Sequence, residues 1–222
     1  MKFWSSRDAA REIGLSSRRI RALARAGRLK AHKVGNRWLV EPISAREVKA
    51  GRPPSSAVAW AILALLSGDR PGWIHSSPLS RLKRRLRDRD WALQSLKGSE
   101  SRARIFRWRA LPSDIAKILK KPGLVLTGLS GVAGEIDLVP ASGEIDAYVS
   151  SDVLRMIERQ FQPAKESDEP NLTLRVPNQP WILKFPRAPL AVVSADLLLD
   201  SEPRVTRAGR EALRKLLSDQ HP

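Results

Sequence analysis

Residues 15–40 read LSSRRIRALARAGRLKAHKVGNRWLV, and this stretch decides the fold of the N-terminal part of the chain. Ser16 is a suitable N-cap for a helix, and a glycine eleven residues later ends the helical pattern. The apolar-rich runs 29–34 and 37–40 follow, and they are joined by a Gly-Asn dipeptide that suits a two-residue turn. The stretch therefore predicts a helix followed by a β-hairpin.

The predicted helix has two opposite faces. At about 100° per residue, Ile20, Leu23 and Ala24 share one face. Arginines occupy the other, where guanidinium groups can fork onto guanine or grip phosphates. An ordinary amphipathic helix with a solvated basic face shows the same pattern. The hairpin favours DNA binding, because helix and wing in this order are typical of a winged helix-turn-helix. The expected DNA-binding residues are Ser17, Arg18, Arg19, Arg21, Arg25, Lys33, Asn36 and Arg37.

A shorter helix is expected before this stretch. Ser5 can cap it, and Asp8 stands three residues later in the position of a capping box. We expect Trp38 to pack the hairpin onto the helices, with base stacking as the alternative. A further helix at 44–50 is expected to complete the N-terminal domain.

The charge of the chain is unevenly distributed. There are 40 Lys and Arg residues against 23 Asp and Glu residues, and the formal net charge is +17. Residues 1–110 hold 26 of the basic residues but only 8 of the acidic ones. A positive field attracts phosphate and releases its counterions, whereas charge that serves only solubility is expected to be spread evenly. The asymmetry predicts a nucleic-acid partner for the first half.

Composition excludes several kinds of site. There is no cysteine, so disulfides, thiolate metal sites and cysteine nucleophiles are excluded, and the three histidines are far apart in the sequence. We therefore expect no metal site and no cofactor. The N-terminus lacks a signal-peptide pattern, and the longest apolar run, 57–66, is too short to span a bilayer. A cytoplasmic protein with no membrane partner is expected.

The N-terminal motifs resemble a known class of DNA-binding domain. SSRDAAREIGLSSRRIRALARAGRLKAHKVGNRWLV, residues 5–40, has an alanine-rich first helix, a second helix, a glycine and a K-V-G-x-x-W hairpin. Over residues 3–50 it resembles the MerR/excisionase class of winged helix-turn-helix domains. The resemblance implies duplex DNA binding with the second helix in the major groove. Many excisionase-type domains carry Thr-Val where this chain has Arg18-Arg19-Ile20, so the base preference stays open.

Residues 53–110 are expected to form a basic helical segment. A helix at 55–67 is apolar almost all round, which is typical of a buried helix. A second helix at 78–97 carries a leucine stripe, which packs against the first helix or pairs with a second copy in a homodimer. Its arginine-rich face contacts either DNA or an acidic protein partner. Residues 101–109 are expected to turn their aromatic side chains inward, with stacking on nucleic acid as the alternative.

Residues 111–222 predict a mixed domain. Glycine-separated strands are expected at 124–128, 135–139, 144–149 and 172–176, with a further strand at 181–185. Helices are expected from Pro112 and at 151–160, 189–199 and 204–217. The predicted class is α+β, with a winged helix-turn-helix at 1–52, a helical segment at 53–110 and a mixed domain at 111–222.

One motif suggests an enzyme. Gly128 and Ser130, followed by Glu135 and Asp137, resemble the glycine-serine turn and carboxylate strand of nucleotidyltransferases. Two carboxylates on one face of a strand hold magnesium in such sites. The spacing leaves little room for the helix that normally follows the turn. We therefore expect acidic surface strands and no catalytic site.

The second half carries a different resemblance. LVLTGLSG (124–131), IDAYV (145–149), NLTLRV (171–176) and ADLLLDSEPRVTRAG (195–209) resemble the C-terminal half of abortive-infection (AbiE-type) antitoxins. This implies an antitoxin that represses its own operon and has a nucleotidyltransferase-like toxin as its partner. The expected function is that of a transcriptional regulator at its own operator, not an enzyme. An excisionase-like architectural factor of a mobile element is the alternative.

Overall fold

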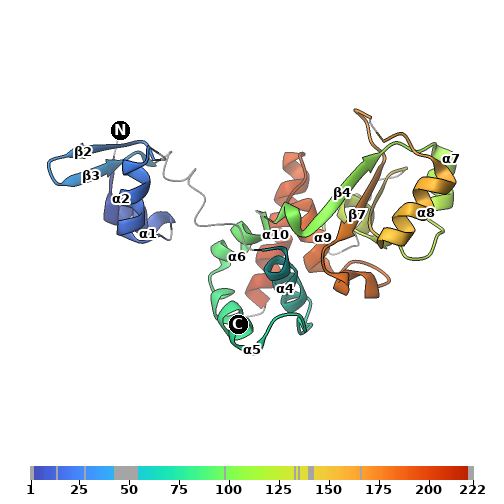
Figure 1. Cartoon of the computed structure of the whole chain (residues 1–222), viewed down its shortest axis with the longest axis horizontal. Helices are drawn as coiled ribbons and strands as arrows, with labels where there is room; N and C mark the ends of the chain where they lie inside the picture. Colours follow the sequence, from blue (N-terminus) through green and yellow to red (C-terminus); the bar gives the residue numbers. More distant parts are fainter. Residues whose placement is uncertain are drawn as a thin grey trace. The chain divides into compact units, whose positions relative to one another are not determined.

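The chain folds into two compact units, Met1–Arg52 and Pro53–Pro222, which are described separately (Figure 1). Their helices and sheets confirm the predicted α+β class. The computed structural model describes residues 3–13, 15–27, 29–42, 55–97, 99–132, 134, 136–139, 143–165 and 167–219.

In its described residues, 3–13, 15–27 and 29–42, the first unit combines the helices α1 and α2 with a small sheet. Its elements are α1 (Ser6–Ile13), α2 (Ser17–Arg25), β1 (Trp4–Ser5), β2 (Ala31–Val34) and β3 (Arg37–Val40). β3 lies between β1 and β2 and pairs antiparallel with both. The sequence does not predict β1, because a two-residue strand has no alternation that a pattern could reveal.

Serine caps fix the starts of both helices, as the sequence predicts. The Ser5 hydroxyl accepts a hydrogen bond from the Asp8 backbone N–H (3.2 Å) and donates one to the Asp8 carboxylate (2.6 Å). Ser16 Oγ accepts from the Arg19 N–H at 3.2 Å. Each cap satisfies a backbone donor that the helix leaves unpaired and contributes about 1 kcal/mol.

One apolar core holds the first unit together. It contains Ala9, Ala10, Ile20, Leu23, Ala24, Leu29 and Val40, which come from both helices, β3 and the residues before β2. Trp38 is half-buried and packs against this core, which confirms its expected structural role. The helix expected at 44–50 lies outside the described residues.

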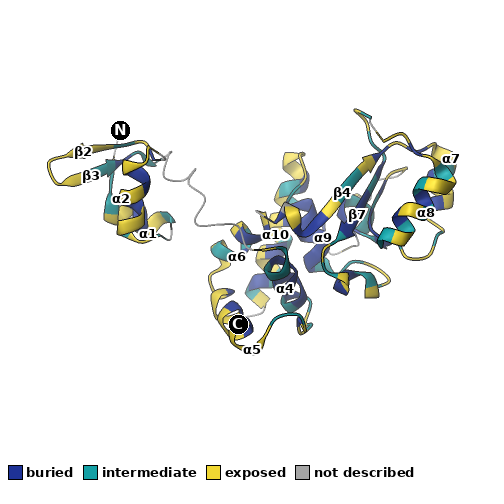
Figure 2. Cartoon of the chain, viewed as in Figure 1, coloured by how far each residue is buried: buried dark blue, intermediate teal, exposed yellow. Residues whose placement is uncertain are grey.

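Among its described residues, the second unit has a largely helical half. The helices of this half are α4 (Ser56–Leu66), α5 (Ser76–Arg85), α6 (Arg89–Lys97), α9 (Leu190–Leu197) and α10 (Pro203–Asp219). α4 and α9 are apolar almost all round and deeply buried, as Figure 2 shows. Trp60 of α4 is fully buried, and its ring meets those of Tyr148 and Trp181 edge-on at 5.4 and 6.1 Å.

The single helix expected at 78–97 is wrong, because residues 86–88 interrupt it. α6 begins again after Asp88, whose carboxylate accepts a hydrogen bond from the Trp91 N–H at 3.0 Å. This side-chain cap competes with a continuous helix. Leu82 and Leu86 pack in the same core as Trp60, which confirms the expected packing of the leucine stripe against α4.

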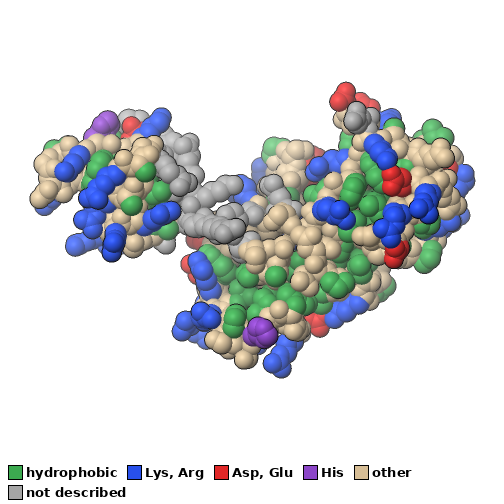
Figure 3. Space-filling view, in the orientation of Figure 1, with side chains coloured by type: hydrophobic (Ala, Val, Ile, Leu, Met, Phe, Trp, Pro, Cys, Tyr) green, Lys and Arg blue, Asp and Glu red, His purple; other side chains and the backbone are tan. Residues whose placement is uncertain are grey.

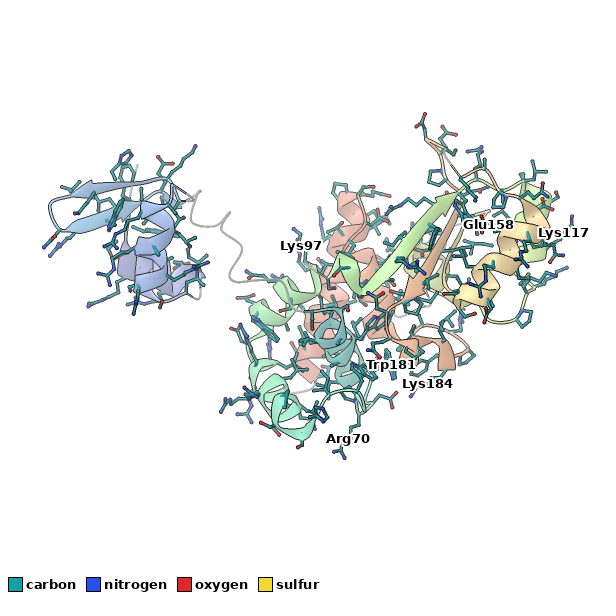
Figure 4. The ribbon with its side chains drawn as sticks, viewed as in Figure 1. Arg70, Lys97, Lys117, Glu158, Trp181 and Lys184 are labelled. Atoms are coloured by element: carbon teal, nitrogen blue, oxygen red, sulfur yellow. The ribbon has the colours of Figure 1, made fainter. Side chains whose placement is uncertain are left out.

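A loop contact ties the end of α4 to a later segment. Trp181 and Lys184 lie next to each other (Figure 4), and both donate hydrogen bonds to the Asp69 carboxylate, at 2.8 and 2.6 Å. The strand expected at 181–185 is wrong, because Pro180–Lys184 forms a 3₁₀ helix, η3. Pro180 suits the first turn of such a helix because it lacks a backbone N–H.

A four-stranded sheet forms the rest of the second unit. It contains β4 (Ala103–Trp108), β5 (Val125–Leu126), β6 (Ile145–Tyr148) and β7 (Leu172–Pro177), in the order β4-β7-β6-β5. β6 and β7 are parallel, and the other two pairings are antiparallel. β4 is therefore an edge strand. Within the segment 101–109, the residues of β4 form a basic strand with Trp108 turned inward, and residues 101 and 102 belong to a preceding 3₁₀ helix, η1 (Glu100–Arg102).

Helices cover both faces of this sheet. α7 (Pro112–Ile118) and α8 (Ser151–Phe161) pack on the face that carries Leu172 and Leu174. Tyr148 on the opposite face joins the core formed with α4, α9 and α10. The boundary expected at residue 110 is wrong, because segments on either side of it share one core and belong to one compact unit.

The strand expected at 135–139 is also wrong. Among the described residues of this stretch, 136–138 form bends and Val139 is irregular, and Leu138 N–H donates to the Ile136 carbonyl at 2.8 Å. An alternating sequence becomes a strand only where a neighbouring strand pairs with it, and none does so here in the described part of the chain. No helix in that described part is long and apolar enough to cross a bilayer.

Candidate nucleic-acid interface

α2 separates an apolar face from a basic face. Ile20, Leu23 and Ala24 are buried in the core of the first unit. Figure 2 shows the helix buried on one side and exposed on the other. The exposed side carries Arg18, Arg19, Arg21 and Arg25. The core thus fixes the orientation of α2 and leaves four guanidinium groups on the surface.

Arg21 is anchored along its own helix. Its Nε atom donates a hydrogen bond to the Ser17 carbonyl at 3.2 Å, and the side chain is exposed. This contact uses one of the five N–H donors of the guanidinium group and leaves the terminal nitrogens for a ligand. Ser17 itself is half-buried, so it is less accessible than the arginines.

The hairpin presents a second set of polar groups. Val34 pairs with Arg37, so the turn consists of Gly35 and Asn36. Gly35 has a φ of +56°, as a primed hairpin turn requires at its first central position. Lys33, Asn36 and Arg37 are all exposed around this turn, and Val34 is 60% exposed.

The electrostatics of the first unit favour an anionic ligand. Figure 3 shows Lys and Arg side chains gathered over α2. Asp8, Glu12 and Glu41 are the acidic residues among those described in this unit. The Ser5 hydroxyl engages Asp8 and lowers the pKa of its carboxyl. Within the described part of the unit, no salt bridge neutralises an α2 arginine, so the positive field stays open to phosphate.

The eight residues predicted to bind DNA therefore fall into two groups on one compact unit. Ser17, Arg18, Arg19, Arg21 and Arg25 lie on α2, whereas Lys33, Asn36 and Arg37 surround the hairpin turn. All but Ser17 are exposed. Exposed Arg7 and Arg11 on α1 add cations that the prediction did not include, although their one-turn spacing on a helix is visible in the sequence.

A second polar cluster lies in the other unit and surrounds Asp196. Asp196 is buried on α9 and accepts hydrogen bonds from Arg102, from Thr127 (2.5 Å), from Tyr148 (3.0 Å) and from Arg175 (3.2 Å). These donors come from distant segments of the chain. We call this set, together with Asp146, the Asp196 cluster.

Asp146 completes this cluster. Arg175 donates from Nε and Nη2 to its two carboxylate oxygens, both at 2.6 Å. Two arginines therefore face two aspartates, and the cluster is formally neutral. Arg102 also donates to the Ser99 side chain at 2.9 Å. A buried charge is tolerated when it is paired and hydrogen-bonded in this way.

The surroundings keep Asp196 ionised. Burial alone would raise the pKa of its carboxyl, but the guanidinium groups of Arg175 and Arg102 more than offset burial and lower this pKa. Burial and the charge of Asp196 raise the pKa of the Tyr148 hydroxyl, which remains a donor at neutral pH. The cluster therefore clamps α9 to the sheet through charge-assisted hydrogen bonds.

The geometry does not assemble the nucleotidyltransferase motif. Ser130 Oγ donates to the Glu144 carbonyl (3.2 Å) and accepts from the Asp146 N–H (2.9 Å), so backbone groups occupy it. Asp137 is exposed but lies on no strand, and Glu135 is outside the described residues. Among described residues, no three His, Asp or Glu side chains gather in a way that could hold a metal ion.

Sequence reasoning missed the Asp196 cluster. One signal was available: Asp196 interrupts the apolar run LAVVSADLLL at 190–199, and an acidic residue inside a buried helix requires a partner. The identity of its partners could not be read, because they lie far from it in the sequence.

Comparison of the chain with protein-family models, curated proteins and solved structures gives no match.

Proposed function

We propose that the chain is a DNA-binding transcriptional regulator whose first unit works as a winged helix-turn-helix. The observation that carries this proposal is the division of α2 into a buried apolar face and an exposed arginine face. In this function α2 enters the major groove, where arginines fork onto guanine O6 and N7. The hairpin turn contacts phosphates beside it.

The proposed role of the regulator is that of an antitoxin which represses its own operon. The sequence resemblance of residues 124–209 to abortive-infection antitoxins supports this part of the proposal. The protein acts in the cytoplasm, its DNA ligand is its own operator, and its protein partner is a nucleotidyltransferase-like toxin. The charge difference between the two halves of the chain agrees with separate DNA-facing and protein-facing parts.

The DNA part is tested by duplex binding. The full chain is titrated into a labelled duplex from upstream of its own gene and into an unrelated duplex, at fixed salt. Arg21→Ala is expected to cost about 1–3 kcal/mol on the upstream duplex if Arg21 contacts a base, and Arg18→Ala/Arg21→Ala more. The control is Arg207→Ala/Arg210→Ala, which removes the same charge from exposed positions of α10. Unchanged binding by the α2 double variant rejects the proposal.

The antitoxin part is tested separately. The neighbouring reading frame is expressed with and without this chain, and growth is measured. Rescue of growth by the chain supports an antitoxin. A neighbour that encodes an integrase, together with strong DNA bending by the chain, favours the excisionase-like architectural role instead. Either result leaves the duplex-binding test intact, so the two parts of the proposal fail independently.

A further inference from the structure

The outer edge of β4 has open backbone hydrogen-bonding groups. The Asn178 N–H donates to the Arg102 carbonyl at 3.0 Å, which extends the antiparallel ladder between β4 and β7 by one pair. Hydrogen-bonded pairs alternate along such a ladder. The even-numbered residues of β4 therefore bond to β7, and the N–H and C=O groups of Ile105 and Arg107 point away from the sheet.

The hydrogen bonds between β7 and β6 lead to the same conclusion about which groups of β4 point outward. Ile145 N–H donates to the Asn171 carbonyl (2.9 Å), and Val149 N–H donates to the Arg175 carbonyl (3.0 Å). The odd-numbered residues of β7 therefore serve β6, and its even-numbered residues serve β4. The register Arg104↔Val176 and Phe106↔Leu174 then places the bonded pairs on even residues of β4.

The chain itself pairs with part of this edge. Arg109 and Ala164 exchange two backbone hydrogen bonds, at 2.9 and 2.8 Å, in antiparallel fashion. An extended segment thus already lies along the outer side of β4 at its C-terminal end. Nearer the N-terminal end of β4, no hydrogen bond from the described residues reaches the outward groups of Ile105 and Arg107.

The charges along this edge select the partner. Arg104 and Arg107 are exposed, whereas Ile105 and Phe106 between them are half-buried. In a strand, Arg104 and Arg107 project to opposite faces of the sheet. A second copy of β4 would add two more arginines to this edge and would offer no acidic side chain to Arg104 or Arg107, because residues 103–108 read ARIFRW. Acidic side chains at matching positions are favourable.

We propose that the outer edge of β4 binds an extended acidic segment of another protein by β-strand addition. The segment pairs antiparallel with residues 104–107, and its backbone takes up the outward groups of Ile105 and Arg107. Acidic residues lie opposite Arg104 and Arg107, with two apolar residues between them. The preferred pattern is therefore acid–apolar–apolar–acid. This inference concerns the second unit and does not depend on DNA binding by the first.

The test uses a defined peptide and the full chain. The probe is the acetylated, amidated peptide TEVVET, and its neutral match is TQVVQT. Binding is followed by NMR titration, and backbone amide exchange is measured residue by residue. We expect the acidic peptide to bind at least about fivefold more tightly at low salt, with the advantage reduced at high salt. It should slow exchange at Ile105 and Arg107, whose amides exchange faster than that of Phe106 in the free chain.

Two variants distinguish the contribution of the backbone hydrogen bonds to peptide binding from the contribution of the arginine charges. Arg107→Pro removes an outward N–H that β7 does not use, so the sheet should persist while peptide binding is lost. Arg104→Glu/Arg107→Glu keeps both donors and should reverse the preference toward TKVVKT. Thermal unfolding checks that each variant is folded, and if Arg107→Pro is not, the charge reversal alone decides.

Several outcomes overturn the proposal. These are equal binding of the acidic and neutral peptides, no binding of either, or protection at residues away from β4. Self-association of the chain that protects Ile105 and Arg107 without peptide identifies a second copy as the occupant. Protection of these amides by duplex DNA in place of the peptide identifies a nucleic-acid surface. Both of the last two results also reject an acidic protein segment.

Discussion

Arg175 donates hydrogen bonds to both carboxylate oxygens of Asp146, from Nε to Oδ1 and from Nη2 to Oδ2, at 2.6 Å each. The same guanidinium group reaches Asp196 on α9 through Nη1 at 3.2 Å. The Arg175 side chain on β7 therefore joins β6, through Asp146, to α9, through Asp196. The position of α9 on the sheet thus depends on a network in which each charge is balanced by others nearby.

Replacement of Asp196 by Asn should strongly destabilise the second unit. The change keeps the shape of the side chain but leaves buried Arg102 without its counter-charge, and such a loss costs about 3–5 kcal/mol. Five of the seven tryptophans lie in this unit, so urea unfolding followed by tryptophan fluorescence reports on it.

The matched control for Asp196→Asn is Asp152→Asn on α8. Asp152 is 85% exposed and pairs with Arg155, and an exposed pair of this kind contributes at most about 1 kcal/mol. Equal effects of the two substitutions contradict the structural role assigned to Asp196.

The contribution of Asp196 should disappear in acid. Its pKa in the folded chain lies below the ordinary value of 3.8, so the unfolded chain binds this proton first as the pH falls. The stabilisation is fully present above the unfolded pKa and is lost as the pH falls through the folded pKa. The measurement is the stability difference between the natural chain and Asp196→Asn from pH 6 to about pH 2. The charge of Asp196 is one of the causes that raise the pKa of the Asp146 carboxyl, so the substitution also shifts the titration of Asp146. A difference that is constant over this range refutes the assignment.

Gly128 should not tolerate a side chain. Its φ is +52°, and a Cβ atom there would lie 2.4 Å from Asp146 Oδ2, so Gly128→Ala must displace the carboxylate that Arg175 holds. Gly143→Ala is the matched control, because Gly143 has a φ of +78° with nothing within 4 Å. Both variants carry about 1–2 kcal/mol of left-handed strain. Gly128→Ala should cost about 1.5–3 kcal/mol more, as charge-assisted bonds are lost. Equal unfolding midpoints for the two variants argue against the contact.

Much of the first unit follows from sequence, because its determinants are local. The caps at Ser5 and Ser16, the two faces of α2 and the turn at Gly35 each depend on residues within a few positions of one another. The fold of the second unit follows less well from sequence, because several of its determinants join distant segments. The alternation at 136–139 has no strand to pair with among the residues that the structure describes, and the Asp196 cluster joins residues brought together only by the fold. A sequence pattern shows the spacing of apolar and polar residues, but it does not show which distant segment pairs or packs with them.

Gly209→Ala should destabilise α10 although alanine is the better helix former. A Cβ atom at Gly209 would lie 2.7 Å from the Ser194 carbonyl oxygen and 2.8 Å from Leu198 N, both on the α9 side of the helix contact. In an open helix the same change stabilises by about 1 kcal/mol. Here the two helices must separate, so we expect a lower unfolding midpoint. Arg210→Ala, at an exposed neighbouring position, should change stability by no more than about 0.5 kcal/mol, and a raised midpoint for Gly209→Ala shows that α9 and α10 are not in close contact.

The hairpin should contribute phosphate contacts without base preference. Lys33 and Arg37 flank an exposed turn, and a cation that contacts only phosphate releases about one counterion on binding. Lys33→Ala/Arg37→Ala should therefore weaken binding to the upstream and unrelated duplexes equally, and should reduce the slope of log affinity against log salt by about 2. Arg207→Ala/Arg210→Ala on α10 provides the charge-matched control, for which the slope should not change. A loss confined to the upstream duplex shows instead that the hairpin reads bases, and an unchanged slope shows that it lies away from the DNA.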